Sequence, residues 1–412
     1  MPVRLRLPIA VVGALVVAEA AVLLMRPRGL LQPLDVAPRA YFSAEQIEKA
    51  EHFRDGQLLL YAAQTAVQLG LLAIVVARPP RILLKPRRRQ WLVGAAATAG
   101  LPVAVALATL PLAVIARQRA KDVGLVTQEW VGYAGDVAKS TAIGAVLAGV
   151  GGALLVVALR RFGRRWWAPG AVAVVAFGVI ATYATPVVLD PLFNKFTPLP
   201  AGHTRSTVLD LARRAGVKVD QVYEMDASRR TTAANAYVTG FGHTKRVVIY
   251  DNLLKKFTPG ETRLVLAHEL GHVRHDDVPH GLLYLAILAP FGMLAVARLG
   301  ERMAPEDGPV AAAVPAVVLA IALIAPAITF ISNQLSRAVE AHADQFALEL
   351  THDPQTFIDF QRQISIQNVG DPDPPGAVQF LLGTHPTTMQ RIGQALRFKE
   401  DRSGGAAPRA GS

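Results

Sequence analysis

The sequence of 412 residues is 52% hydrophobic and only 18% charged, and its 43 Lys and Arg outnumber its 31 Asp and Glu. This composition excludes a disordered chain. The absence of cysteine excludes disulfides, iron–sulfur clusters and thiolate zinc sites, so any metal must be held by His, Asp or Glu. The apolar residues form long runs flanked by Arg-rich stretches, which favours a membrane protein over a nucleic-acid-binding one.

The apolar runs are long enough to cross a lipid bilayer. A helix of about 20 apolar residues spans the roughly 30 Å hydrocarbon core, because it rises about 1.5 Å per residue. Seven stretches reach this length. They are residues 7–25, 57–77, 91–116, 141–159, 167–189, 279–297 and 309–331. The sequence therefore predicts a mainly α-helical, multi-pass protein of the cell membrane, surrounded by lipid.

The first of these stretches admits a second interpretation. The residues MPVRLR ahead of it and the Ala18-Glu19-Ala20 triplet resemble a cleaved signal peptide, although the apolar run is long for one. Glu19 would be costly in contact with lipid. We therefore expect its side chain to face the interior of the helix bundle or to reach the end of the span.

Residues 190–278 form the only long polar insertion between two spans. Residues 204–215 have the pattern of a short helix. The β-branched and aromatic runs 218–225, 235–240 and 246–250 are separated by Gly and polar turn residues, and they predict a small antiparallel sheet.

A helix start follows the predicted strands. Thr258 is suited to the N-cap, Pro259 to the first turn, and Glu261 lies three residues after the cap, where its side chain can bond back to it. The helix that begins here has the sequence ETRLVLAHELGHVRHDD.

Beyond the last span, residues 354–367 and 388–398 have the pattern of short amphipathic helices, and residues 400–412 that of a disordered tail. The predicted fold is a polytopic helical membrane part with a small α+β domain. Its parts are spans 1–5 with their loops (1–189), the α+β insertion (190–278), spans 6 and 7 (279–331), a C-terminal segment (332–399) and the tail (400–412).

His268-Glu269-Leu270-Gly271-His272 fits the H-E-x-x-H pattern of zinc sites. Residues four apart lie on one face of a helix, so both imidazoles can bind the same ion. Glu269 lies about 100° around the helix from His268, where it can reach a water on the metal without being a ligand. The pattern predicts one Zn²⁺ per chain, with His268 and His272 as ligands and Glu269 as general base.

A catalytic zinc needs a third protein ligand and an open position for water. Glu340 is the best candidate, because the two spans between it and His272 return the chain to the same face of the membrane. Asp344, one helical turn later, can accept the second ring N–H of a ligand histidine. Alternatively, Glu340 forms an ordinary surface ion pair with Arg337.

Three further histidines lie close in sequence to these candidates. His275 and His280 are interpreted as solvated or interfacial side chains rather than ligands. His342 points away from Glu340 on the same helix and is not expected to bind the metal.

Over about residues 7–399, the chain resembles the type I CAAX prenyl protease family of integral-membrane zinc metallopeptidases. Separated motifs occur in the family's order. They are DPLFNKFTPL at 190–199, NAY at 235–237, HELGH at 268–272, SRAVEAHADQFAL at 336–348, and THP at 384–386 followed by Arg391-Ile392. FSAEQIEKAEHFRDGQ, at 42–57, also resembles the family's first loop.

This resemblance implies that zinc is bound by His268, His272 and Glu340. It also implies that Glu269 acts as general base and that Asp344 lies behind the ligands. The spans of the family surround a large water-filled chamber with the metal site in its wall.

For the substrate, the resemblance implies that Asn235, Ala236 and Tyr237 belong to an edge strand that pairs with the peptide backbone. His385 resembles a residue near the reacting carbonyl, with a role in stabilising the oxyanion. The implied substrate is a peptide or a membrane protein. Many bacterial members have no evident prenylated substrate, so the family name does not define it.

The implied activity is peptide hydrolysis by a zinc endopeptidase. Two alternatives remain open: a quality-control membrane protease of the HtpX type, which has fewer spans, and a catalytically inactive chamber or transporter that retains the fold. A nucleic acid is not an expected partner, because no basic recognition helix stands apart from the spans. The sequence leaves the oligomeric state unknown.

Seven spans place the two termini on opposite faces of the membrane. The basic loops RPPRILLKPRRR and RRFGRR then lie on the face opposite to HELGH, and the positive-inside rule places that face in the cytoplasm. Eukaryotic members of the family are understood to turn the catalytic face toward the cytosol. The two expectations conflict, so the orientation stays open at this point.

Overall fold

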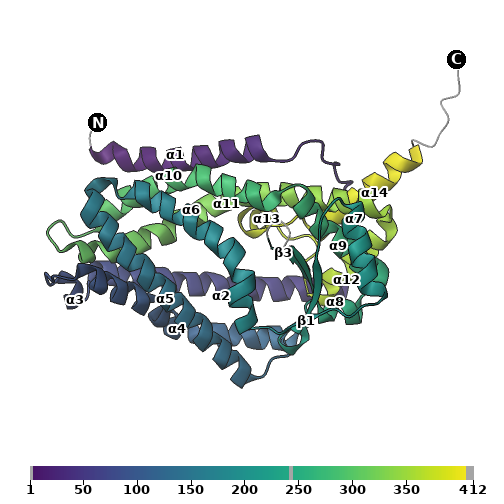
Figure 1. Ribbon diagram of the computed structural model, residues 1–412, viewed down its shortest axis with the longest axis horizontal. Helices are drawn as coiled ribbons and strands as arrows, with labels where there is room; N and C mark the ends of the chain where they lie inside the picture. The colour runs from purple at the N-terminus through teal and green to yellow at the C-terminus, as the bar shows by residue number, and fades with distance from the viewer. Residues whose placement is uncertain (1–2, 241–244, 405–412) are drawn as a thin grey trace, which may run out of the picture.

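The computed structural model describes residues 3–240 and 245–404 (Figure 1). Seven helices in this part of the chain are long and apolar enough to cross a membrane. They are α1 (Val3–Met25), α2 (Ala44–Ala77), α4 (Gln90–Asp122), α5 (Trp130–Phe162), α6 (Trp167–Ala184), α10 (Asp277–Met303) and α11 (Val314–Thr351). The predicted spans are confirmed. α2 begins before its apolar run and α11 continues 20 residues beyond residue 331, because both helices extend into the polar domain.

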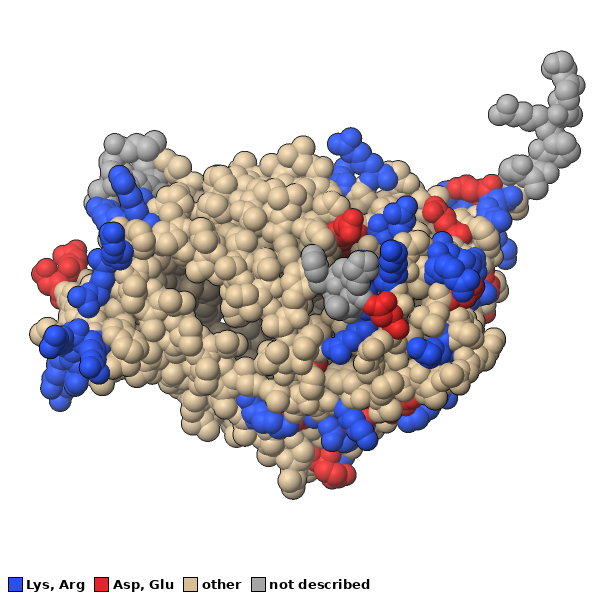
Figure 2. All heavy atoms as spheres, viewed as in Figure 1, with Lys and Arg blue, Asp and Glu red and all other residues tan. Residues whose placement is uncertain are grey.

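The membrane helices form a ring. α1, α10 and α11 pack side by side, α2 contacts both α11 and α4, α4 packs along α5, and α6 packs on α10 (Figure 1). α5 and α6 make few contacts with each other, and on this side Figure 2 shows a hollow in the apolar surface. In α10 and α11, 39% of the residues in the most apolar stretch are buried inside the protein. In α4 and α6, none of the residues in that stretch are buried. The hollow lies where the resemblance leads us to expect a chamber.

Glu19 lies within α1, which packs against α10 and α11 as part of the ring. Its Oε2 accepts a hydrogen bond of 3.3 Å from Nε2 of Gln334 on α11. The neighbouring Ala18 is fully buried. Glu19 thus faces another helix, which satisfies a carboxyl group that lipid could not.

The polar insertion forms one four-stranded sheet in the order β1 (Phe196–Pro198), β2 (Gln221–Met225), β4 (Arg246–Tyr250) and β3 (Ala236–Thr239). β1 with β2 and β3 with β4 are antiparallel, but β2 and β4 are parallel. The prediction of an antiparallel sheet therefore holds for two of the three strand pairs and is wrong for β2 with β4, and β1 was not predicted. The parallel pair arises because β3 takes the edge position, which leaves β4 beside β2.

Shorter helices surround the sheet. They are α7 (His203–Arg214), α8 (Asp251–Lys256), α9 (Pro259–Arg274), α12 (Pro354–Gln367), α13 (Gly376–Leu382) and α14 (Thr388–Gly404). α7, α9, α12 and α14 were predicted. α8 and α13 were not, and neither was α3 (Arg81–Leu84) between α2 and α4, because one or two turns leave little periodic pattern.

The disordered tail was predicted to begin too early. α14 continues through Gly404, so residues 400–404 are helical. Arg397 and Glu400 form an ion pair of 3.2 Å one turn apart, and Arg402 donates to Nδ1 of His352 over 2.7 Å. These contacts extend the helix. The rest of the predicted tail, residues 405–412, lies outside the described residues.

One hydrophobic core joins the sheet to helices from distant parts of the chain. Val247 of β4, Leu264 of α9, Leu348 of α11 and Phe357 of α12 are each at most 2% exposed. Burying such a side chain stabilises the fold by about 1.5–3 kcal/mol. Because Leu348 belongs to the helix of the seventh span, this core fixes α11 against α9.

Candidate metal centre

α9 begins where the sequence predicts. Oγ1 of Thr258 accepts the N–H of Glu261 over 3.3 Å, and Oε2 of Glu261 accepts the N–H of Thr258 over 2.7 Å. This reciprocal capping box satisfies two amide groups at the helix start. The regular helix that follows places His268 and His272 one turn apart.

The two histidines and Glu340 converge on one point. The Nε2 atoms of His268 and His272 are 3.1 Å apart, and the carboxylate oxygens of Glu340 lie 3.1 Å from the first and 3.6 Å from the second. Ligands about 2.0–2.1 Å from a tetrahedral zinc ion are about 3.3 Å from one another, so this spacing fits a single ion. Oε2 of Glu340 is buried and accepts no hydrogen bond. A bound cation would satisfy this oxygen.

Glu269 lies in the same group. A carboxylate oxygen of Glu269 and one ring nitrogen from each of His268 and His272 all lie within 4.8 Å of one another. Burial raises the pKa of Glu269, although the neighbouring histidines oppose this shift. The carboxyl group predicted to be the general base is therefore within reach of the two imidazoles.

Asp344 lies behind His268. Its Oδ1 is 2.9 Å from Nδ1 of His268, and Arg391 of α14 donates from Nε to Oδ2 over 2.7 Å. Asp344 is fully buried, so the pairing with Arg391 offsets a charge that would be costly alone. Burial disfavours the imidazolium form of His268, but the carboxylates of Asp344 and Glu340 outweigh this effect and raise the pKa of His268 to about 10.

His272 has a similar partner, which the sequence did not predict. Oδ2 of Asp277, the first residue of α10, lies 2.8 Å from Nδ1 of His272. The chain turns between α9 and α10 at Asp276, whose φ of 55° is left-handed, and this turn directs Asp277 back toward α9. The only signal in the sequence was the acidic pair that follows the HELGH helix. Carboxylates on both Nδ1 atoms favour tautomers that leave both Nε2 atoms free for a metal.

His385 lies in the loop between α13 and α14, on the open side of the group. Its Nε2 is 3.3 Å from Oε2 of Glu340, and its Nδ1 is 2.9 Å from Oγ1 of Thr384. The His385 side chain is 56% exposed, whereas that of Glu340 is only 14% exposed. His385 is therefore the group at this centre that solvent or a ligand can reach most easily.

Arg337 is turned toward the loop of His385. Its Nη1 donates to the carbonyl oxygens of Gln379 and Gly383, at 3.0 and 2.6 Å, where α13 ends. The alternative interpretation, a surface ion pair between Arg337 and Glu340, is therefore wrong. The two bonds instead tie the α13 loop to the helix that carries Glu340.

Three neighbouring histidines, His275, His280 and His342, lie outside the group of converging ligand atoms. The rings of His275 and His342 stack with their centroids 3.7 Å apart and their planes at 12°. Nδ1 of His280 lies 3.1 Å from the carbonyl oxygen of His275. These contacts are local to the junction of α9, α10 and α11.

The NAY tripeptide lies at the start of β3, which packs beside α9. Ala236 is 1% exposed and pairs with Ile249 of β4, and Oη of Tyr237 donates to Oδ2 of Asp190 over 3.2 Å. Oδ1 of Asn235 accepts the N–H of Ala236 over 2.9 Å. Among the described strands, β3 pairs only with β4. Its outer edge therefore has backbone groups free to pair with an extended peptide.

The motif at 42–57 joins the membrane ring to the C-terminal helices. Arg54 of α2 forms an ion pair with Asp371, in the segment after α12. Arg119 of α4 donates to the carbonyl oxygen of His52 over 3.1 Å, and its guanidinium fills the space that a side chain at Gly56 would need. A glycine at this position thus allows the close approach of Arg119.

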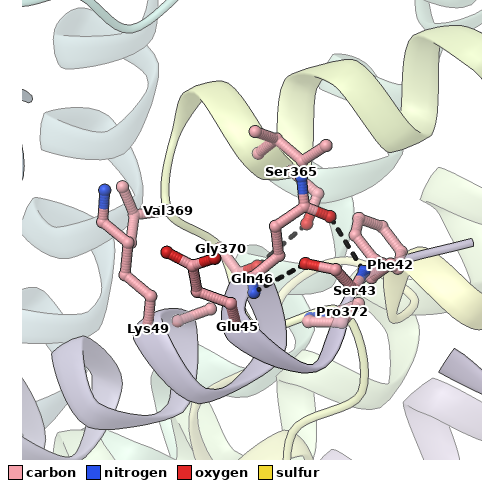
Figure 3. A pocket seen from close by; sticks show the side chains of 11 residues that line it. Phe42, Ser43, Glu45, Gln46, Lys49, Ser365, Val369, Gly370 and Pro372 are labelled. Atoms are coloured by element: carbon pink, nitrogen blue, oxygen red, sulfur yellow. Dashed lines mark hydrogen bonds between the residues drawn. The ribbon is translucent and has the colours of Figure 1, made fainter. Parts of the chain in front are cut away.

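A pocket of about 290 Å³ lies between the first turns of α2 and the turn after α12 (Figure 3). Ser43 and Gln46, which line it, bond to each other at 3.0 and 3.2 Å and cap α2. None of the predicted site residues lines this pocket. It is therefore separate from the candidate metal centre.

The fold and the centre together define an integral-membrane metallopeptidase. Residues 198–399 match the family model described as peptidase family M48, and residues 100–195 match that described as CAAX prenyl protease N-terminal, five membrane helices. The chain is 31% identical over 303 residues to the uncharacterized metalloprotease YhfN of Bacillus subtilis, a match that covers 72% of this chain and 71% of the relative. The chain belongs to peptidase family M48.

A second relative matches part of the chain, and a solved structure shares its fold. The CAAX prenyl protease 1 homolog of Oryza sativa is 34% identical over 187 residues, which is 44% of each chain. The chain thus spans less than half the length of this relative. The crystal structure of S. mikatae Ste24p has the same fold, with a TM-score of 0.75 at 19% identity, over 96% of this chain and 99% of that one.

Proposed function

We propose that this metallopeptidase is a zinc-dependent endopeptidase in which His268, His272 and Glu340 bind one metal ion. The observation that carries the proposal is the convergence of two Nε2 atoms with a buried, unbonded oxygen of Glu340. Two imidazoles and one carboxylate form a ligand set that catalytic zinc commonly has in peptidases. When bound, zinc supplies a Lewis acid that polarises the scissile carbonyl and lowers the pKa of water.

Glu269 acts as the general base in this proposal. It accepts the proton of the attacking water and delivers it to the leaving amine. A pKa raised by burial favours this role, because the base must hold the proton before releasing it. Asp344 and Asp277 hold the two imidazoles in place through their Nδ1 atoms.

His385 contacts the substrate in this proposal. Its exposed imidazole lies beside Glu340, where an N–H can stabilise the negative charge that develops on the carbonyl oxygen. The free edge of β3, at Asn235, Ala236 and Tyr237, binds an extended peptide as an added strand. The substrate is a peptide or a membrane protein.

The alternatives fit the structure less well. Proteases of the HtpX type have fewer spans than the seven membrane helices of the described chain. A catalytically inactive chamber or transporter does not account for an acidic residue, Glu269, beside the three proposed ligands His268, His272 and Glu340.

The test uses the full chain purified in detergent. We expect one zinc ion per chain by elemental mass spectrometry, and internal cleavage of a peptide mixture that stops with a chelator and returns with zinc. Full cleavage after complete zinc removal would contradict a metal-dependent mechanism. Release of terminal residues alone would contradict an endopeptidase. One zinc ion per chain without cleavage of any peptide would favour the inactive chamber.

A further inference from the structure

One end of the membrane ring is strongly basic. Residues 78–89, between α2 and α4, contain six Lys or Arg and no acidic residue, and residues 160–165, from the last turn of α5 to the start of α6, contain four Arg and none. All ten of these side chains are exposed. Figure 2 shows several blue groups, with one red group beside them, at the end of the molecule that is remote from the sheet and α9. We call residues 78–89 and 160–165 the basic end.

Apolar side chains are interleaved with the charges of the basic end. Ile82 is 49% exposed, Leu84 43%, Trp91 43% and Phe162 47%. Exposed aromatic and aliphatic groups beside Arg and Lys, directly at the ends of spans, suit the headgroup region of a bilayer. The basic end is thus in position to contact lipid headgroups.

The third loop at this end, between α10 and α11, has mixed charge. The last turns of α10 and this loop contain Glu301, Glu306 and Asp307 against Arg298 and Arg302. Glu301 pairs with Arg298 at 2.9 Å and with Arg164 of the basic end at 3.4 Å. Acidic residues contribute little to the orientation of a membrane protein, which depends mainly on Lys and Arg in short loops. These three carboxylates face two Arg of the same segment and the ten Lys and Arg of the basic end, so they do not cancel the basic end.

The opposite end of the ring has no comparable patch in its short loops. Residues 26–43 contain three Arg and one Asp, and residues 118–129 contain one Arg, one Lys, one Asp and one Glu. The polar domain at 190–278 is long, and long domains cross the membrane largely regardless of their charge. The short loops therefore carry a clear asymmetry between the two ends.

We infer that the basic end lies against anionic phospholipid headgroups of the cytoplasmic leaflet, and that the metal centre faces away from the cytoplasm. Lys and Arg in short loops are retained on the cytoplasmic side, where the leaflet surface is negative. Substrates then reach the metal centre from the extracytoplasmic side. This orientation is opposite to the one that the resemblance to eukaryotic proteases suggests. The inference goes beyond the proposed function and does not depend on it.

Because the chain contains no cysteine, one introduced cysteine is the sole site for a thiol reagent. Two full-length variants suit the test: Arg88→Cys at the basic end and Lys256→Cys on α8, both at exposed positions. A membrane-impermeant maleimide should label Lys256→Cys in intact cells, and Arg88→Cys only after the cells are opened. The reverse pattern, or equal labelling of both variants in intact cells, would overturn the inference.

A second pair of variants tests whether the charges set the orientation. Arg87, Arg88 and Arg89 are changed together to Gln in the chain that carries Lys256→Cys, and labelling in intact cells is divided by labelling after lysis. We expect this ratio to fall severalfold, because part of the population inserts the other way round. The matched control changes Arg26, Arg28 and Arg39 to Gln and should leave the ratio unchanged. An unchanged ratio in the first variant would show that these charges do not hold the basic end in the cytoplasm.

Discussion

Nδ1 of His268 lies 2.9 Å from Oδ1 of Asp344, so the imidazole on the HELGH helix is oriented by a carboxylate on the helix of the seventh span. The same carboxylate accepts a hydrogen bond from Arg391 on α14. Three elements that are distant in sequence thus meet behind one ring nitrogen. The orientation of His268 therefore depends on the packing of α11 and α14 as well as on α9.

The variant Asp344→Asn tests this relationship. Asn has nearly the same size but lacks the charge that pairs with His268 and Arg391. Loss of such a partner typically lowers metal affinity by about 10–100-fold, and we expect an effect in this range. Zinc affinity is measured by competition with a chromogenic chelator. An unchanged affinity would show that α9 alone orients His268.

Asp277 and Asp276 offer a matched comparison on the other histidine. Asp277→Asn removes the carboxylate 2.8 Å from Nδ1 of His272, whereas Asp276 is exposed and Asn tolerates its left-handed φ of 55°. We expect zinc affinity to fall by about tenfold or more in Asp277→Asn and to stay unchanged in Asp276→Asn. Equal losses in the two variants would point to a change in the α9–α10 turn instead.

The proposed base can be removed without removing a metal ligand. Glu269→Gln should retain one zinc per chain and lose at least about 10²-fold in kcat, because the amide of Gln cannot take the proton from water. Glu349→Gln on α11 makes the same chemical change at an exposed position and should keep full activity. Both are compared by zinc content and peptide cleavage. Full activity of Glu269→Gln would refute the proposed mechanism.

Zinc binding should depend on pH in a defined direction. In the metal-free protein the pKa of His268 is raised to about 10, so below that pH the imidazole is protonated and zinc must displace the proton. The apparent zinc affinity should therefore rise about tenfold per pH unit between about pH 7 and 9. Isothermal titration at several pH values measures this slope. A flat profile would contradict the proton displacement.

Arg337 is expected to position His385 without touching the metal. Arg337→Ala leaves the carbonyl groups of Gln379 and Gly383 without this donor, and we expect kcat to fall by about tenfold while zinc content and KM change little. Arg337→Lys should restore part of the rate, because its ammonium can bond one carbonyl. A loss of zinc in proportion to activity would instead indicate a general structural role.

The membrane spans and the two histidines of the metal centre, His268 and His272, follow from local patterns in the sequence. Helix periodicity alone places His268 and His272 on one face, since it acts over four residues. Hydropathy located all seven spans, because a bilayer imposes the same length on each. The predicted helix at residues 354–367 has the bounds of α12 (Pro354–Gln367).

The rest of the centre depends on contacts between distant residues, which leave no periodic pattern in the chain. Asp277 reaches His272 only because Asp276 reverses the chain, and Arg391 reaches Asp344 only because α14 packs on α11. The parallel pairing of β2 with β4 likewise depends on β3 taking the edge of the sheet. Local sequence preferences extend over a few residues, so the choice among such packings is made by the burial of the whole core.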